Sequence, residues 1–122
     1  MTLESLLRPA LHNIEETLDK QDLEGFIKCY SETAAIVDIT EKKVHSGRDE
    51  IGAMFKEWLK FGKWTAETTN EKFGGGEELI RYSAHFTLKF EDGKQVSFNI
   101  LQYWRKAGDS YEVENEHFSM AG

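Results

Sequence analysis

Two side chains that lie far apart in this sequence could support acid–base chemistry. Asp38 ends the apolar run 34–37, which is typical of a strand, so its carboxylate should lie at the strand tip. His117 shares the alternation of Tyr111 and Val113, and we expect it to point inward or toward the open end of the fold. An inward histidine beside an aspartate could act as a general acid or base. Two alternatives stay open: Asp38 faces solvent or caps a turn, and His117 is a hydrogen-bonded core residue.

Several aromatic side chains could line an apolar pocket near these groups. They are Trp58, Phe61, Trp64, Tyr103 and Trp104. An apolar pocket with a few polar groups would suit a small, mostly apolar ligand. Ordinary core packing is the alternative, because aromatic residues supply much of the buried area of any domain.

Other kinds of chemical site are not indicated. The four histidines show no paired ligand spacing and Cys29 is the only cysteine, so a zinc site is not expected. The glycines at 74–76 lack the lysine and helix that a phosphate-binding loop needs, so we expect them to form a turn. Serine nucleophile and dinucleotide motifs are also missing from the sequence. We therefore predict neither a metal nor a cofactor.

Length and charge limit the class of protein. The 122 residues suffice for a single domain, 1–122. A formal net charge of -7 argues against a nucleic-acid partner and against an anionic membrane surface. A single cysteine excludes an intrachain disulfide, and the N-terminal segment lacks the apolar core of a signal peptide. We expect a cytoplasmic protein.

The candidate residues must be positioned by three helices that come early in the chain. Apolar residues at helical spacing predict a helix over 3–18, which should begin near Ser5 or bend at Pro9. Asp22 is suited to cap a second, short helix. A third helix should follow Gly47 and end at Gly62.

Strands make up most of the rest of the chain. One strand is expected early, at 34–39, and four long ones follow at 64–73, 78–90, 95–106 and 110–120. Helices first and strands later indicate an α+β fold. Such a long meander must curl, with the helices over its concave face, which leaves a cone with one open end.

Four segments in this order carry a resemblance to a known superfamily. They are 22–26 followed by Tyr30, 34–38, 45–51, and 103–106 with Tyr111 and 117–119. Over essentially its whole length the chain resembles the nuclear transport factor 2-like superfamily, in its SnoaL-like branch. The resemblance implies a cystatin-like α+β cone, a curved and mostly antiparallel sheet packed against three N-terminal helices. It also implies a homodimer packed through the sheet.

The resemblance also places part of a catalytic site. Ketosteroid isomerase, a member of this superfamily, uses an aspartate at the end of this strand as general base, and Asp38 lines up with it. Its oxyanion hole needs a tyrosine and a protonated aspartate. Those positions fall on Ile14 and near Gln102 in this sequence. Gln102 could still donate a hydrogen bond, but steroid isomerisation is not expected.

We therefore expect a SnoaL-like domain that binds a small, mostly apolar molecule in its cone. The residues expected to contact that ligand are Gln102, Trp58, Trp104 and Tyr103. One alternative is a cofactor-free isomerase, cyclase or dehydratase with Asp38 as general base. The other is a protein-interaction or oligomerisation module, since this fold supports many functions.

Overall fold

The computed structural model describes residues 1–121 as three helices and one six-stranded sheet. In chain order the elements are α1 (Leu3–Asp19), α2 (Leu23–Lys28), β1 (Tyr30–Asp38), β2 (Lys43–Ser46), α3 (Gly47–Leu59), β3 (Trp64–Gly76), β4 (Leu79–Phe90), β5 (Gln95–Ala107) and β6 (Ser110–Met120). Helices precede the long strands, as expected for an α+β fold.

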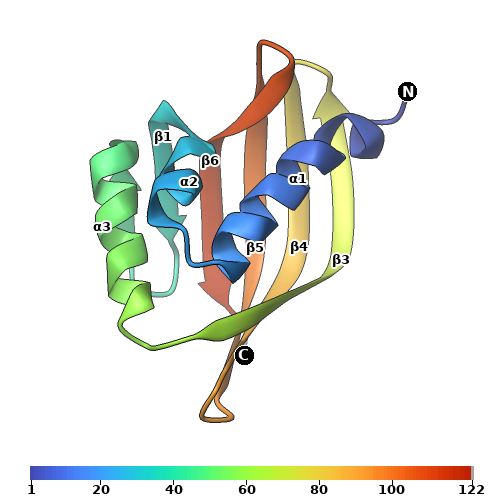
Figure 1. Ribbon diagram of the computed structural model, residues 1–122. Coiled ribbons are helices and arrows are strands. Elements are labelled where there is room, and N and C mark those ends of the chain that lie inside the picture. Colours follow the sequence, from blue (N-terminus) through green and yellow to red (C-terminus); the bar gives the residue numbers. More distant parts are fainter. Residues whose placement is uncertain (122) are drawn as a thin grey trace.

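The sheet is mixed and curved, and its strand order is β2-β1-β6-β5-β4-β3. Only the β1–β6 pair is parallel, and the other neighbours are antiparallel. Figure 1 shows α1 and α2 lying across one face of the sheet and α3 beside β1. The sheet does not close on itself, so the helices and the curled strands form an open cone, which confirms the expected architecture.

Helix α1 covers the predicted range 3–18, begins at Leu3 instead of near Ser5, and continues through its proline. Thr2 caps it, because the Thr2 hydroxyl oxygen accepts a hydrogen bond of 3.0 Å from the Ser5 backbone N–H. Pro9 lies inside the helix and is exposed. A proline at this position leaves the Ser5 carbonyl without its helical donor, and water can replace that donor at an exposed position.

Two local predictions about strands and turns are wrong. No strand was predicted between 39 and the third helix, but the short strand β2 lies there and pairs with the end of β1. The glycines at 74–76 end β3 instead of forming the turn, which lies at Glu77 and Glu78. Gly75 has a φ of +87°, and a Cβ there would lie 2.5 Å from the Leu79 carbonyl oxygen. Glycine is therefore required at this strand end by close backbone approach.

A β-bulge in β6 decides which of its side chains face the helices. Trp104 of β5 lies opposite Val113, whereas Tyr103 lies opposite Asn115, so Glu114 is an extra residue. An extra residue shifts the alternation by one position. The side chains that follow the bulge therefore lie on the opposite face from the one that strict alternation predicts.

The bulge residue Glu114 is held from two neighbouring strands. Its Oε2 accepts a 2.8 Å hydrogen bond from the Thr33 hydroxyl of β1. Its Oε1 lies 3.1 Å from Nη1 of Arg105 in β5. These contacts tie the extra residue to both strands that flank β6.

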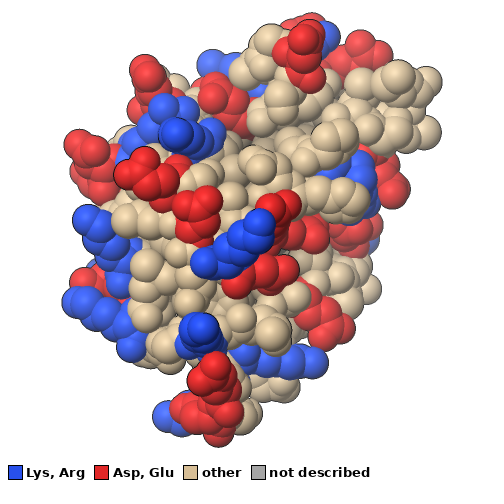
Figure 2. Space-filling view, viewed as in Figure 1, with Lys and Arg blue, Asp and Glu red and all other residues tan. Residues whose placement is uncertain are grey.

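The core lies between the helices and the concave face of the sheet. Leu7 and Leu11 of α1, Phe55 of α3, and Ile80 and Trp104 of the sheet are almost fully buried in it. On the surface that Figure 2 shows, Lys and Arg side chains are interspersed with Asp and Glu. Within residues 1–121, no helix is long and apolar enough to cross a membrane.

Candidate functional site

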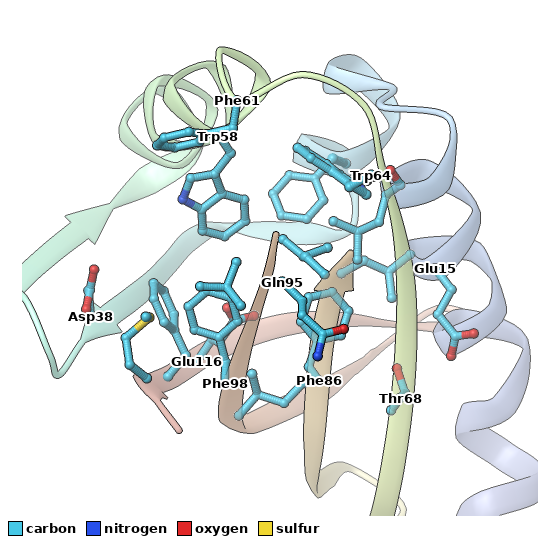
Figure 3. Close-up of a pocket in the computed structure, with 18 of the residues that line it drawn as sticks. Glu15, Asp38, Trp58, Phe61, Trp64, Thr68, Phe86, Gln95, Phe98 and Glu116 are labelled. Carbon is cyan, nitrogen blue, oxygen red and sulfur yellow. Dashed lines mark hydrogen bonds between the residues drawn. The ribbon is translucent and has the colours of Figure 1, made fainter. Parts of the chain in front are cut away.

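A pocket of about 800 Å³ opens between the concave face of the sheet and the helices. Its wall is mostly aromatic and aliphatic, and it draws side chains from all three helices, from β1 and from β3 to β6 (Figure 3). Phe61, just after α3, is 72% exposed, and its ring lies 6.3 Å from that of Phe90, with both residues in the lining. An exposed ring in the lining marks the open end of the pocket.

A buried carboxyl group, Glu116 of β6, forms the polar floor of this apolar pocket. The residue is 5% exposed. Its Oε1 accepts a 2.6 Å hydrogen bond from the Tyr30 hydroxyl and a 2.7 Å hydrogen bond from Nε2 of Gln102. Trp104 in turn donates from Nε1 to Gln102 Oε1 at 2.9 Å, which fixes the orientation of the amide. Oε1 is therefore fully engaged by the protein.

The second oxygen of Glu116 is free. Oε2 has no hydrogen-bond partner among residues 1–121, and it is not sealed from the pocket, which Glu116 lines. Burial raises the pKa of Glu116 above its usual value, although the hydrogen bonds from Tyr30 and Gln102 act in the opposite direction. A carboxyl group of this kind can hold a proton at higher pH than a surface glutamate. It can then offer a ligand either a donor or an acceptor.

The partners of Glu116 are positioned by local structure at the start of β1. Asp22 caps α2 by accepting a 3.1 Å hydrogen bond from the Gly25 N–H, and Tyr30 follows that short helix. Arg48 of α3 donates from Nε to the Tyr30 carbonyl at 2.9 Å. Tyr30 is 1% exposed, and burial followed by the charge of Glu116 raises its pKa well above the usual tyrosine value. Tyr30 therefore stays protonated and acts as a donor.

The other buried aromatic polar groups in the wall are occupied by protein partners. Trp64 donates from Nε1 to the Leu18 carbonyl at 2.9 Å. The Tyr82 hydroxyl donates to Oε2 of Glu71 at 2.6 Å, and Arg8 donates to the same oxygen at 3.0 Å. These bonds join α1 to the sheet. They leave Trp64 and Tyr82 to act in the pocket mainly as apolar surfaces.

Glu15 of α1 is a second carboxyl group in the lining. It is half-buried, and desolvation raises its pKa against the opposing attraction of His12. Figure 3 shows Glu15 and Asp38 on opposite sides of the aromatic cluster, with Thr68 on the same side as Glu15. The pocket thus carries carboxyl groups on both flanks as well as at its floor.

Asp38 lies at the edge of the pocket and caps a turn. It lines the pocket and is half-exposed, but its Oδ1 accepts a 3.0 Å hydrogen bond from the Glu41 backbone N–H. This is one of the alternatives that the sequence left open. A role for Asp38 as general base remains a prediction.

The expectation that His117 points inward is wrong. Glu116 and Phe118 line the pocket, whereas His117 alternates with them and is not among the lining residues. The reason is the bulge at Glu114, which reverses the alternation that places Val113 inside. The structure therefore does not bring Asp38 and His117 together in one cavity.

The four residues expected to contact a ligand lie in different places. Gln102 and Trp58 line the pocket. Trp104 is buried behind Gln102 and supports it, so it lies outside the lining. Tyr103 alternates with these two inward residues and lies on the outer face of β5. The prediction that Tyr103 and Trp104 line the pocket is thus wrong. Tyr103 lies on the outer face of the sheet, and Trp104 is buried behind the lining residue Gln102.

Sequence reasoning missed the main polar residues of the site, Glu116 and Tyr30. The alternation that places Tyr111, Val113 and His117 inside puts Glu112, Glu114 and Glu116 on the solvent face of β6. Phe118 has the same parity as these glutamates, so a regular strand would expose its ring to solvent. An exposed phenylalanine at this position was the signal that the alternation breaks. In the part of the chain that the structure describes, no group of three His, Cys, Asp or Glu residues is placed to hold a metal ion.

Comparisons with known proteins identify the fold. No protein-family model and no curated protein matches the sequence. A protein of unknown function with a cystatin-like fold from Nostoc punctiforme matches with a TM-score of 0.84 and 17% identity, over 99% of this chain and 93% of that one. A nuclear transport factor 2-like protein of unknown function from Pseudomonas putida also has a TM-score of 0.84 at 17% identity, over 95% of this chain and 84% of that one.

A third structure links the fold to the enzyme named above. A ketosteroid isomerase-like protein from Erwinia carotovora atroseptica matches with a TM-score of 0.78 and 12% identity, over 100% of this chain and 99% of that one. Identities this low show a shared fold and leave activity open. The chain therefore has the nuclear transport factor 2-like, cystatin-like fold that its sequence predicted.

Proposed function

We propose that this protein binds a small, mostly apolar molecule in the cone pocket. The observation that carries the proposal is a cavity of about 800 Å³ with an apolar wall and one buried carboxyl group at its floor. Small-molecule sites typically combine an apolar wall with a few placed polar groups. Glu116 is the group that orients the ligand, because its Oε2 is open to the pocket.

A matched pair of variants tests this binding function. Val96 lines the pocket, whereas Val44 is exposed on β2 and lies outside the lining. Val96→Trp should fill part of the cavity and weaken binding of the neutral dye Nile red by about tenfold, a loss of about 1.4 kcal/mol. Val44→Trp should leave the affinity within about twofold, since it adds the same ring elsewhere. Fluorescence titration of both variants and the wild type measures these affinities.

Native mass spectrometry of the purified protein is the second test. A retained ligand would appear as added mass on the protein, and denaturation would release it for identification. Failure of the wild type to bind the dye, or equal binding by both tryptophan variants, would contradict the proposal.

We also propose that the outer face of the sheet forms a homodimer contact. Tyr103, Asn115 and His117 are half-buried side chains on this face, which the helices leave uncovered. Sedimentation at micromolar concentration tests this assembly. A single 14.1 kDa species would refute it.

A further inference from the structure

The charged side chains of the pocket wall are unbalanced in sign. Five of the lining residues carry a carboxyl group, and one, Lys94, carries an ammonium group. The carboxyl groups belong to Glu15, Asp38, Glu41, Asp92 and Glu116. Lys94 Nζ lies 3.9 Å from Oδ2 of Asp92, so its positive charge is already offset locally. The lining therefore presents a negative potential to a ligand.

The most enclosed of these carboxyl groups is Glu116, and one of its two oxygens lacks a hydrogen-bond donor among residues 1–121. Both protein donors to Glu116 converge on Oε1, and Oε2 has none among residues 1–121. An ionised carboxylate has about four acceptor sites, so a donor from a ligand would find an unused oxygen. An unpaired buried acceptor costs free energy, so a ligand that donates to it removes this cost.

The pocket wall next to Glu116 along β6 is aromatic, because Phe118 lies two positions further on the same face. The rings of Phe98 and Phe118 pack nearly at right angles with centroids 5.6 Å apart, and Trp58 lies 6.0 Å from Phe118. Aromatic faces attract cations in addition to burying hydrocarbon. The wall therefore favours a ligand that is apolar over most of its surface and carries a positive charge at one end.

This inference rests on the proposed binding function and specifies its ligand. We propose that the pocket takes a hydrophobic amine whose nitrogen donates a hydrogen bond to Oε2 of Glu116, in preference to a neutral or acidic molecule with the same skeleton. A carboxylate or phosphate ligand would meet like charge at the floor and on both flanks of the pocket.

The proton balance of binding is simple. A free amine that meets a protonated Glu116 takes its proton, and an ammonium ion that meets an ionised Glu116 keeps its own. Both routes end in the same ion pair between the ammonium group and the carboxylate. Charge-assisted hydrogen bonds of this kind are about twice as strong as neutral ones.

Three probes with one skeleton test the proposal. They are 2-naphthylmethylamine, 2-naphthalenemethanol and 2-naphthoic acid, titrated calorimetrically into the wild-type protein at neutral pH. The amine should bind about tenfold more tightly than the alcohol, and the acid should bind most weakly. This ranking requires no variant, so it stands whether or not a substitution disturbs folding.

Two variants test whether the preference for the amine depends on Glu116. Glu116→Gln keeps a carbonyl oxygen for Tyr30 and Gln102 but removes the charge, so the preference for the amine should disappear. Asp109→Asn removes an exposed carboxylate in the turn between β5 and β6, outside the pocket lining, and should keep the preference within about twofold. Equal affinity for the amine and the alcohol in the wild type would overturn the amine proposal and leave the binding function intact. Binding of none of the three probes would overturn both.

Discussion

Two carboxyl groups of this pocket, Asp38 at its rim and Glu116 at its floor, occupy contrasting environments. Asp38 is half-exposed and accepts a hydrogen bond from a neighbouring backbone N–H of its own turn. Glu116 is buried and accepts from side chains of two other strands. The first contact is local and the second depends on the whole fold. A carboxylate at a strand tip is easily noticed in a sequence, but tertiary burial is what makes a carboxyl group chemically distinct.

The largest expected difference between the two groups is in stability. Glu116→Ala would leave the Tyr30 hydroxyl and the Gln102 amide without their acceptor and would enlarge the cavity. We expect a loss of about 2–3 kcal/mol in the free energy of unfolding. Asp38→Ala removes one exposed turn contact and should cost at most about 1 kcal/mol. Urea unfolding of both variants at the same pH measures the difference, and equal losses would remove the distinction drawn here.

The free energy of unfolding should depend on pH because of Glu116, the carboxyl group at the pocket floor. Because burial raises the pKa of Glu116, the native state binds this proton more tightly than the unfolded state does. Its contribution is fully present below the unfolded pKa of about 4.3 and is lost as pH rises through the higher native value. The limiting slope is about 1.4 kcal/mol per pH unit.

The comparison that isolates this effect is between the wild type and Glu116→Gln. The free energy of unfolding of the wild type should fall relative to that of the variant as pH rises above the usual glutamate range. Tyr30 is the titratable side chain that donates to Glu116, and it stays protonated because its own pKa is raised. Parallel stability curves for the two proteins would show that Glu116 titrates as an ordinary surface group.

Tyr30→Phe should have the smallest effect. It removes one of the two donors to Glu116 and should cost about 1 kcal/mol of stability. The hydrogen bond from Tyr30 lowers the pKa of Glu116, so its loss should move that pKa further upward. Carboxyl chemical shifts, followed by NMR across the pH range, measure the change. A downward movement would contradict the assigned network.

Much of the fold could be predicted because its signals are local. In β4, apolar side chains alternate without interruption from Ile80 to Phe90, and those of Ile80, Tyr82 and Leu88 are buried as that alternation requires. The Asp22 cap depends on residues three positions apart. The stripe over 3–18 predicted the extent of α1, whereas a start near Ser5 was wrong because Thr2 caps the helix at Leu3.

The site could be predicted only in part because it depends on one irregular position. Counting alternate residues along β6 fails at Glu114, where an added residue shifts the pattern. His117 was therefore assigned the place that Glu116 occupies. The pairing of Tyr30 with Glu116 joins residues 86 positions apart, and no local pattern reports such a contact.

The bulge at Glu114 also has an evolutionary consequence. Deletion of Glu114 would leave Glu116 facing the cavity, because the later residues keep their register with β5. If instead Glu114 were paired as a regular member of β6, strict alternation would turn the imidazole of His117 toward the cavity and the carboxyl group of Glu116 away from it. Loss of the bulge, with every residue of β6 retained, would thus exchange an acid for a histidine at the pocket floor and would also turn Phe118 outward. A descendant lineage could acquire a different chemistry at this position by a change in strand pairing, with its chain length unchanged.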